Sequence, residues 1–275
     1  DQMEDIDESD DENSDDHFYV DRTRPKFEEY VLPHPIWTEE QLASITMTHK
    51  KPERLADYMA YLSVLALRTT WDLSTGYLLG RRLGLFKFSS RMWLLRVTFL
   101  ETVAGVPGMM FGMVRHLNSL RRLERDRGWI NSLLAEAENE RIHLLTAMYL
   151  YKPKALMRYA IVIAQGIMCS FLFTAYLVSP RYCHSFVGYL EEQAVHTYTN
   201  LVQDIDDGKY PEFQEKCSNL AKAYWKIPTD KATWRTVFAN IRADESKHRD
   251  VNHELADIAD DKHAVNPYRN EYKTR

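Results

Sequence analysis

Two Glu-x-x-His units constrain the fold of this chain more than any other feature of its sequence. They are Glu140-Arg-Ile-His143 and Glu245-Ser-Lys-His248, and each lies inside a segment with helical periodicity. Residues at positions i and i+3 share one face of a helix, so each unit offers a carboxylate and an imidazole to the same point. About one such unit is expected from composition alone. Two units on separate helices are instead typical of bundles that bind a pair of metal ions between their helices.

The rest of the chain favours helices as well. Gly and Pro number only ten each, while 45% of the residues are apolar and 12% are aromatic. Long periodic runs with few breakers indicate an all-α chain. The expected helical segments are 53–87, 92–123, 129–150, 154–178, 182–207 and 232–260, with a short helix inside 206–228. The predicted fold is therefore a ferritin-like four-helix di-iron bundle with two additional long helices that form a membrane-facing flank.

The length of 275 residues suits one sizeable domain, which we expect over residues 51–265. Ten of the first sixteen residues are Asp or Glu, which predicts a solvated, disordered acidic tail over residues 1–20. Residues 21–50 contain three prolines and scattered aromatics, which indicates an extended arm ordered only by contact. Residues 266–275 are expected to form a C-terminal tail.

Two further helices offer lone carboxylates. Glu101 lies in a mostly apolar run, and Glu191 and Glu192 follow the apolar stretch 186–190. A buried charge is costly unless it is paired or binds a metal. Glu191 shares a helix face with small and apolar side chains, so we take it as the bridging carboxylate. Glu192 shares a face with His196, and a hydrogen-bonded structural pair is expected there.

Six hard ligands that are mostly carboxylates favour iron or manganese, whereas zinc prefers fewer ligands with more nitrogen or sulfur. Cys169, Cys183 and Cys217 have no Cys-x-x-Cys spacing, so neither a disulfide framework nor a zinc ribbon is indicated. The alternative interpretation is that these Glu and His residues lie on solvated helix faces.

The stretch 159–178 has only three clearly polar side chains and is long enough to cross a bilayer. A crossing there would put the helices that carry Glu140 and Glu191 on opposite sides of the membrane. We therefore expect an apolar flank dipped into one leaflet, with a buried core helix as the alternative. The formal net charge of -5 gives no overall basic field, so nucleic acid is not an expected partner.

These segments resemble the alternative oxidases, quinol-oxidising di-iron enzymes of the mitochondrial inner membrane. The resemblance covers about residues 90–268. It rests on Leu100-Glu101-Thr102, Asn139-Glu140-Arg141-Ile142-His143-Leu144, Leu190-Glu191-Glu192-Gln193-Ala194-Val195-His196-Thr197-Tyr198, and Arg242-Ala243-Asp244-Glu245 with His248 and Asn252-His253. Two departures are Gln193, where most members have a third consecutive Glu, and Ile142 in place of the usual Met.

The resemblance implies a role for each matching residue. The iron-binding carboxylates would be Glu101, Glu140, Glu191 and Glu245, with His143 and His248 beside the metals. Tyr198 resembles the redox-important tyrosine of the family, and Arg96 and Thr197 match positions that face the quinol head group. Supporting groups would be Asn139, Asp244, Tyr224 and Trp225. The family suggests a homodimer, and His116 and His184 match positions of contact between subunits.

The implied activity is that of a ubiquinol:oxygen oxidoreductase, which reduces O2 to water with two iron ions as cofactors and pumps no protons. The enzyme would lie peripheral to one leaflet of the inner membrane of a mitochondrion or a related organelle. Two alternatives stay open, because a ligand motif alone does not fix a reaction. They are a quinone-ring hydroxylase on the same di-iron bundle and a non-enzymatic iron-binding helical protein.

Overall fold

The computed structural model describes residues 32–269 of the chain. Residues 32–269 belong to one compact unit. The predicted acidic tail, the first part of the arm and residues 270–275 lie outside the described range.

Six long helices carry the fold, and no strand occurs within the described residues 32–269. They are α2 (Leu55–Ser74), α3 (Ser90–Arg122), α4 (Trp129–Leu150), α5 (Ala155–Val178), α6 (Pro180–Asp206) and α8 (Trp234–Ile258). Shorter pieces are α1 (Glu39–Ser44), the π-helical turn η2 (Leu78–Arg82), the 3-10 turn η3 (Pro211–Gln214) and α7 (Asn219–Tyr224). The all-α prediction is confirmed, and so is the short helix expected between 206 and 228.

Local signals set several helix ends. The side chains of Ser89, Ser179 and Thr233 accept hydrogen bonds from the first turns of α3, α6 and α8. The single helix expected over 53–87 is wrong. Gly76 adopts a φ of 70°, which ends α2, and the chain continues through η2 and a loop to α3.

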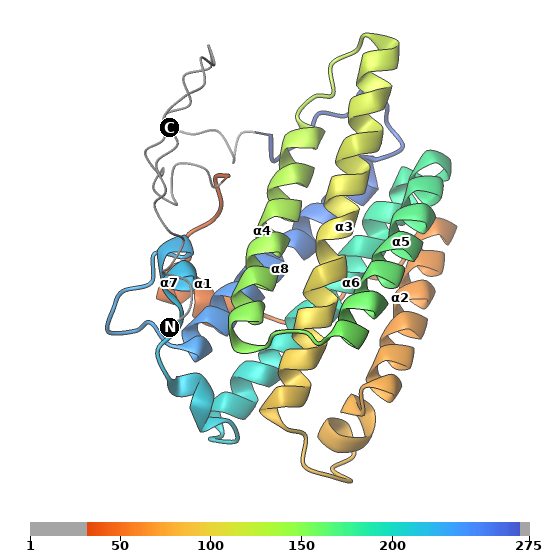
Figure 1. The fold of residues 1–275 in the computed structure, drawn as a ribbon. Helices are drawn as coiled ribbons and strands as arrows, with labels where there is room; N and C mark the ends of the chain where they lie inside the picture. Colours follow the sequence, from red (N-terminus) through yellow and green to blue (C-terminus); the bar gives the residue numbers. More distant parts are fainter. Residues whose placement is uncertain (1–31, 270–275) are drawn as a thin grey trace, which may run out of the picture. The chain divides into compact units, whose positions relative to one another are not determined.

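Four of the long helices form the central bundle (Figure 1). α3 packs along α4, and α6 packs along α8. α2 covers α6 and α5 covers α3, so these two helices lie outside the bundle. The arrangement is the one predicted, a four-helix bundle with two additional long helices on its flank.

One close approach fixes the spacing between α3 and α4. A Cβ atom on Gly108 would lie 2.5 Å from the backbone oxygen of Leu133, so the two helices meet at a position where only glycine fits. Gly105, one turn earlier, lies against Ala137 and Glu140. The two contacts bring the Glu101 segment of α3 beside the Glu140 segment of α4.

The flanking helices expose apolar side chains. Leu156 of α5 is 82% exposed and Ile167 is 66% exposed, while Leu62 of α2 is 59% exposed. α3 and α5 are both long and apolar enough to cross a membrane, but only 11% of the apolar stretch of α5 is buried, against 50% for α3. α5 is therefore a surface helix with an unpartnered apolar face, rather than a core helix.

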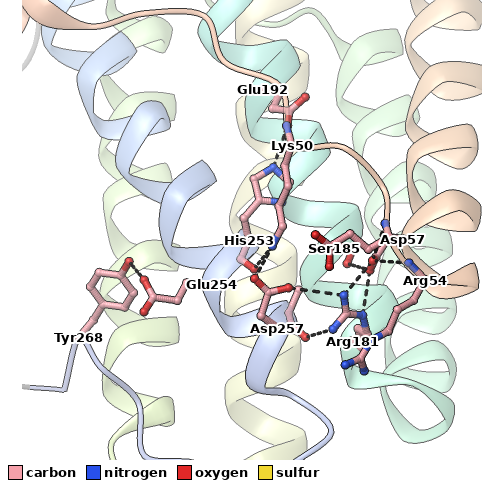
Figure 2. Close-up of polar contacts among 12 residues, drawn as sticks. Lys50, Arg54, Asp57, Arg181, Ser185, Glu192, His253, Glu254, Asp257 and Tyr268 are labelled. Carbon is pink, nitrogen blue, oxygen red and sulfur yellow. Dashed lines mark hydrogen bonds and ion pairs between the residues drawn. The ribbon is translucent and has the colours of Figure 1, made fainter.

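The described part of the arm, residues 32–50, lies along the bundle through specific contacts. The ring of His34 stacks on Tyr224 at 3.7 Å, and Arg249 donates to the Thr46 oxygen. The end of the arm is held at Lys50, whose ammonium group donates to Asp257 and to the His253 oxygen (Figure 2). These contacts hold residues 32–50 against the bundle.

Below Lys50, a buried ion pair joins α2 to α6. Arg181 donates to both carboxylate oxygens of Asp57, at 2.9 and 2.8 Å, and Ser185 donates to the same carboxylate (Figure 2). Burial opposes the ionisation of Asp57, but its hydrogen bonds to Arg181, the Arg54 backbone and Ser185 together outweigh burial and hold the pKa of Asp57 well below its usual value.

The two histidines matched to subunit contacts differ in exposure. His184 is fully buried between helices, where its ring pairs with Tyr176 and Asn252. The expectation for His184 is therefore wrong, because its side chain does not reach the surface of the chain. His116 is exposed.

Candidate metal centre

The four helices of the bundle bring six side chains together at its centre. α3 contributes Glu101 and α6 contributes Glu191, while α4 and α8 each contribute a Glu-x-x-His unit. None of the six residues is more than 5% exposed. They form two groups whose ligand atoms lie within 4.8 Å of one another. The groups are Glu101, Glu140, His143 and Glu245, and Glu140, Glu191, Glu245 and His248.

Glu140 and Glu245 belong to both groups, which makes them the carboxylates that can bridge two metal ions. Glu191 belongs to one group only, so this grouping favours Glu140 and Glu245 over Glu191 as bridging carboxylates. The helix face correctly predicts that Glu191 points inward. It does not tell where along the bundle axis the carboxylate lies relative to the other three helices.

The imidazoles point their Nδ1 atoms at these carboxylates. His143 Nδ1 lies 3.6 Å from Glu101 Oε2, 3.5 Å from Glu140 Oε2 and 3.4 Å from Glu245 Oε1. His248 Nδ1 lies 2.8 Å from Glu140 Oε1 and 3.5 Å from Glu245 Oε2. Each ring therefore turns one nitrogen to the centre of its group.

The donor set fits metal ions. Buried polar atoms normally have hydrogen-bond partners, yet several buried atoms here lack one. They are Glu101 Oε2, both Glu140 oxygens, His143 Nδ1, Glu245 Oε2 and His248 Nδ1. These six buried oxygen and nitrogen atoms have no hydrogen-bond partner, and they lie close together. Bound cations would satisfy such a set of atoms.

The electrostatics of the cluster point the same way. Burial, reinforced by the charges of Glu140 and Glu245, raises the pKa of Glu101 to about 8. Burial and the same two charges raise the pKa of Glu191 well above its usual value. Four buried carboxylates with two histidines are unstable as anions unless positive charge is added, and divalent or trivalent cations supply it.

Asp244 orients His143 from the side away from the cluster. Its Oδ2 atom lies 3.1 Å from His143 Nε2 and accepts the indole N–H of Trp225 at 2.8 Å. Asn139 donates to the same oxygen and to the hydroxyl of Tyr224. Burial opposes the ionisation of Asp244, but its hydrogen bonds hold the pKa of Asp244 below the usual value. All four residues predicted to support the site meet here.

Sequence reasoning missed two groups beside the cluster. Trp37 of the arm donates its indole N–H to Asp244 Oδ1 at 2.6 Å. The prolines of the arm predicted an extended segment, but they did not predict this contact. Glu136 is buried one turn before Glu140, and Asn252 donates to both of its oxygens at 2.8 and 3.0 Å. Its spacing of four residues from Glu140 was the available signal, since it puts both carboxylates on one face of α4. Burial raises the pKa of Glu136 to about 7.

Tyr198 lies directly against the cluster. Its hydroxyl group donates to Glu101 Oε1, and burial raises the pKa of this phenol well above its usual value. The phenol is therefore a neutral proton donor that contacts a candidate ligand.

An apolar cavity of about 730 Å³ leads from the flank to the cluster. Its outer wall includes Leu67 of α2 and Ile167 of α5, both of which are exposed. Its inner end is lined by Glu101, Glu191, Glu245 and Tyr198. A ligand of this cavity can reach the candidate metal ligands from the apolar surface of the molecule.

Two arginines share one aspartate beside this cavity. Arg68 donates to Asp72 Oδ2 and to the hydroxyl of Thr197, both at 2.7 Å, and it lines the cavity with Thr197. Arg96 is fully buried and donates to Asp72 Oδ1 at 2.6 Å. Arg96 is not among the residues that line the cavity, because Asp72 and Thr75 hold its guanidinium group behind the wall. The cation nearest Thr197 is thus Arg68, which the sequence did not single out.

The predicted pair of Glu192 and His196 does not form. The carboxylate of Glu192 binds His49, the Lys50 backbone and His253 instead, each at 2.8 or 2.9 Å. Figure 2 shows Glu192 with Lys50 and His253. His196 Nδ1 faces Asn200, one turn further along α6. Residues of the arm and of α8 bind the carboxylate in place of His196. Helix periodicity cannot predict contacts between separate segments.

The fold and the site define an all-helical bundle protein with two adjoining carboxylate and histidine groups that can hold metal ions. Comparison with known proteins agrees with this class. The profile of the family described as "Alternative oxidase" matches residues 37–257.

Curated relatives match over most of the chain. The "Alternative oxidase, mitochondrial" of Blumeria graminis is 44% identical over 94% of this chain and 75% of its own length. Proteins of the same name from Ajellomyces capsulatus and Yarrowia lipolytica are each 46% identical. They are matched over 87% and 82% of this chain, and over 69% and 65% of their own lengths. The chain belongs to the alternative oxidase family, and it is accordingly an oxidoreductase, a terminal oxidase.

Proposed function

We propose that this protein is a ubiquinol:oxygen oxidoreductase that reduces O2 to water at a di-iron carboxylate centre. The observation that carries the proposal is the apolar cavity, which joins an exposed apolar flank to Glu101, Glu191, Glu245 and Tyr198. A quinol is a lipid-soluble ring that carries two removable protons and electrons, so it needs an apolar path that ends at a redox centre. Residues 51–265 would form the catalytic domain.

The two irons would be held by Glu101, Glu140, Glu191 and Glu245 with His143 and His248. Their role, once bound, would be to accept electrons from quinol and deliver four of them to O2. The donor set supports iron over zinc, since it is rich in carboxylate oxygen. Glu140 and Glu245 are the proposed bridging ligands because each belongs to both ligand groups.

The protein would contribute orientation and proton control. Asp244, held by Asn139, Trp225 and Trp37, accepts from His143 Nε2 and so fixes which ring nitrogen faces the metals. Tyr198 holds a proton at its hydroxyl, where it contacts both Glu101 and the end of the cavity. We therefore propose Tyr198 as a catalytic residue.

The quinol head group would bind beside Thr197. The hydroxyl of Thr197 accepts from Arg68, which is itself held by Asp72 and lines the same cavity. Arg96 would act indirectly, since its contact with Asp72 leaves that carboxylate positioned for Arg68. A partly buried, fixed cation beside an acceptor is suited to orient the two oxygens of a quinol ring.

The exposed apolar faces of α2 and α5 support attachment to one leaflet of a membrane. A span is disfavoured because α3, the other long apolar helix, carries Glu101 and packs along α4. The relatives are named mitochondrial, which supports the mitochondrial inner membrane or that of a related organelle as the location. A homodimer is proposed from the family alone. With no span, the protein would pump no protons.

The test is oxygen uptake by the purified, iron-loaded protein with ubiquinol as the sole electron donor. We expect sustained uptake, two quinols oxidised per O2 and no release of hydrogen peroxide. A quinone-ring hydroxylase would need an external reductant and would yield a hydroxylated ring, which mass spectrometry of the products would show. An iron-storage protein would accumulate iron beyond two ions per chain, and it would show no quinol turnover.

A further inference from the structure

A fifth carboxylate lies beside the candidate metal centre without belonging to either ligand group. Glu136 is on α4, one turn before Glu140, and the spacing of four residues puts both side chains on one face of that helix. Glu136 is only 7% exposed. A buried carboxylate needs partners that offset the loss of water. The partners of Glu136 therefore decide what this side chain does.

The only hydrogen-bond donor to Glu136 within residues 32–269 is the side-chain amide of Asn252. The amide nitrogen lies 2.8 Å from Glu136 Oε1 and 3.0 Å from Glu136 Oε2. The same nitrogen donates to the backbone oxygen of His248 at 3.0 Å. Among the described residues, no arginine or lysine forms an ion pair with Glu136. A neutral amide supplies hydrogen bonds and no charge, so the negative charge of Glu136 is not compensated by its direct partner.

His184 fixes the direction of this amide. Asn252 Oδ1 lies 3.1 Å from His184 Nδ1, and an amide oxygen can only accept, so the imidazole donates there. His184 Nε2 then carries no hydrogen and accepts the hydroxyl of Tyr176. Burial lowers the pKa of His184 to about 4, which keeps its ring neutral with one donor and one acceptor. The amide nitrogen of Asn252 is thus held toward Glu136.

The hydrogen bonds of Glu136 favour its ionised form. Both carboxylate oxygens accept from the same N–H group, and an ionised carboxylate is a pure acceptor. Burial raises the pKa of Glu136 to about 7, and cations on the neighbouring ligand groups would lower it again by attraction. Glu136 is therefore a fixed negative charge beside an occupied metal centre.

The charge of Glu136 falls on one of the two ligand groups. The charges that act most strongly on Glu101, which belongs only to the first group, do not include Glu136. Glu136 does act on every member of the second group, which are Glu140, Glu191, Glu245 and His248. The bond from Asn252 to the His248 backbone ties it to the same side. A fixed anion on one side makes the two metal positions electrostatically different.

We propose that the buried carboxylate of Glu136 stabilises the ferric state of the iron held by the group that contains His248. The attraction between an anion and a cation is proportional to the charge of the cation, so it favours a ferric ion over a ferrous one. Glu136 would thereby lower the reduction potential at that position and leave the other position nearly unchanged. The inference rests on the di-iron centre proposed above, and it adds the residue that sets which of the two positions is reduced first.

The test compares Glu136→Gln with the unaltered, iron-loaded protein. Glutamine has the same shape and keeps an acceptor for Asn252, so the substitution removes little besides the charge. A redox titration followed by Mössbauer spectroscopy, which distinguishes ferric from ferrous iron, gives the two potentials. Release of iron to a chelator gives the strength with which each ion is held. Glu136→Asp keeps a carboxylate and is the rescue variant.

The matched control is Glu138→Gln. This variant removes a carboxylate from the same helix, where Glu138 pairs with Arg141 at 2.5 Å on the surface side. It changes the net charge by the same amount as Glu136→Gln. Any effect of net charge alone would therefore appear in both variants.

We expect one of the two potentials to rise in Glu136→Gln and the other to stay. A ferric affinity that falls tenfold more than the ferrous affinity raises a one-electron potential by about 59 mV. One of the two ferric ions should be held about 10–100-fold more weakly against the chelator, as is typical for loss of a group behind the metal ligands. Glu136→Asp should restore most of the potential, and Glu138→Gln should match the unaltered protein.

Unchanged potentials in a Glu136→Gln protein that holds two irons would overturn the role of Glu136 and leave the di-iron centre intact. An equal rise of both potentials would overturn the assignment to one position. A Glu136→Asp protein that behaves as Glu136→Gln would show that the charge is not the cause. Glu136→Met, with an apolar side chain of similar length, repeats the measurement where Glu136→Gln does not fold. Lack of bound iron in the unaltered protein would instead overturn the di-iron proposal itself.

Discussion

The indole N–H of Trp37 donates to Asp244 Oδ1 at 2.6 Å, and Asp244 Oδ2 lies 3.1 Å from His143 Nε2. A side chain of the arm thereby contacts the group that orients a candidate metal ligand. The described part of the arm, residues 32–50, carries no ligand of either group. It can affect the site through this aspartate and through Tyr224, on which His34 stacks.

Replacement of Trp37 by Phe should weaken the site without removing a ligand. The variant leaves Asp244 with one donor fewer, so His143 is less firmly oriented, and loss of such a partner typically costs about 10–100-fold in metal affinity or activity. Iron retention during dialysis against a chelator measures the effect. Ile36→Ala, at a neighbouring exposed position, is the control and should behave as the unaltered protein. Unchanged iron retention in Trp37→Phe would show that the contact is incidental.

Glu140→Ala or Glu245→Ala should abolish oxygen uptake and lower bound iron. Each change removes a carboxylate that belongs to both ligand groups, so both metal positions lose a ligand at once. Metal analysis of the purified variants, together with oxygen uptake, checks the outcome. Glu138→Ala on the same helix removes a carboxylate that pairs with Arg141 at the surface, and it should keep iron and activity. Full iron content in either ligand variant would contradict the assignment.

Tyr198→Phe should retain both irons and lose most of the activity. The substitution removes only the hydroxyl group that donates to Glu101, and the buried ring keeps its packing against Phe238. We expect kcat to fall by at least about tenfold, since a positioned proton donor typically contributes 10²–10⁴-fold. Normal iron content with normal kcat would show that the Tyr198 hydroxyl has no catalytic role.

His184 should make stability fall as the pH is lowered through the weakly acidic range. Burial lowers its pKa from 6.5 to about 4. Between these values the unfolded chain binds a proton that the folded chain does not, so stability is highest above pH 6.5 and falls until about pH 4. The largest contribution is about 3 kcal/mol, at 1.36 kcal/mol per pKa unit.

Chemical denaturation at several pH values measures this slope. His184→Gln should flatten it between pH 6.5 and pH 4, whereas His116→Gln, at an exposed position, should leave it unchanged. An unaltered slope in His184→Gln would mean that other groups govern the acid sensitivity of the fold.

Periodicity was sufficient to predict which carboxylates point inward. Glu191 rather than Glu192 enters the cluster because helix faces follow from spacing alone. The same reasoning could not find Trp37 or the partners of Glu192, because those contacts join segments far apart in the chain.

Burial of polar groups was harder to predict than helix position. Arg96 was expected to face the quinol head group, yet its guanidinium group is completely buried and pairs with Asp72. His184 was expected at a surface between subunits, but its ring is buried and pairs with Asn252 and Tyr176. In each case a partner on another helix compensates the cost of removing a polar group from water, and no local pattern reveals such a partner.

The contact at Gly108 has a consequence for the ligands that lie two turns away. The gap between α3 and α4 is set there by the bare backbone, with the Leu133 oxygen in the place that a methyl group would take. Any side chain at this position would wedge the two helices apart and widen the space between Glu101 and Glu140. The distance between Glu101 and Glu140 in the candidate metal site thus depends on a glycine that contacts neither group of ligands.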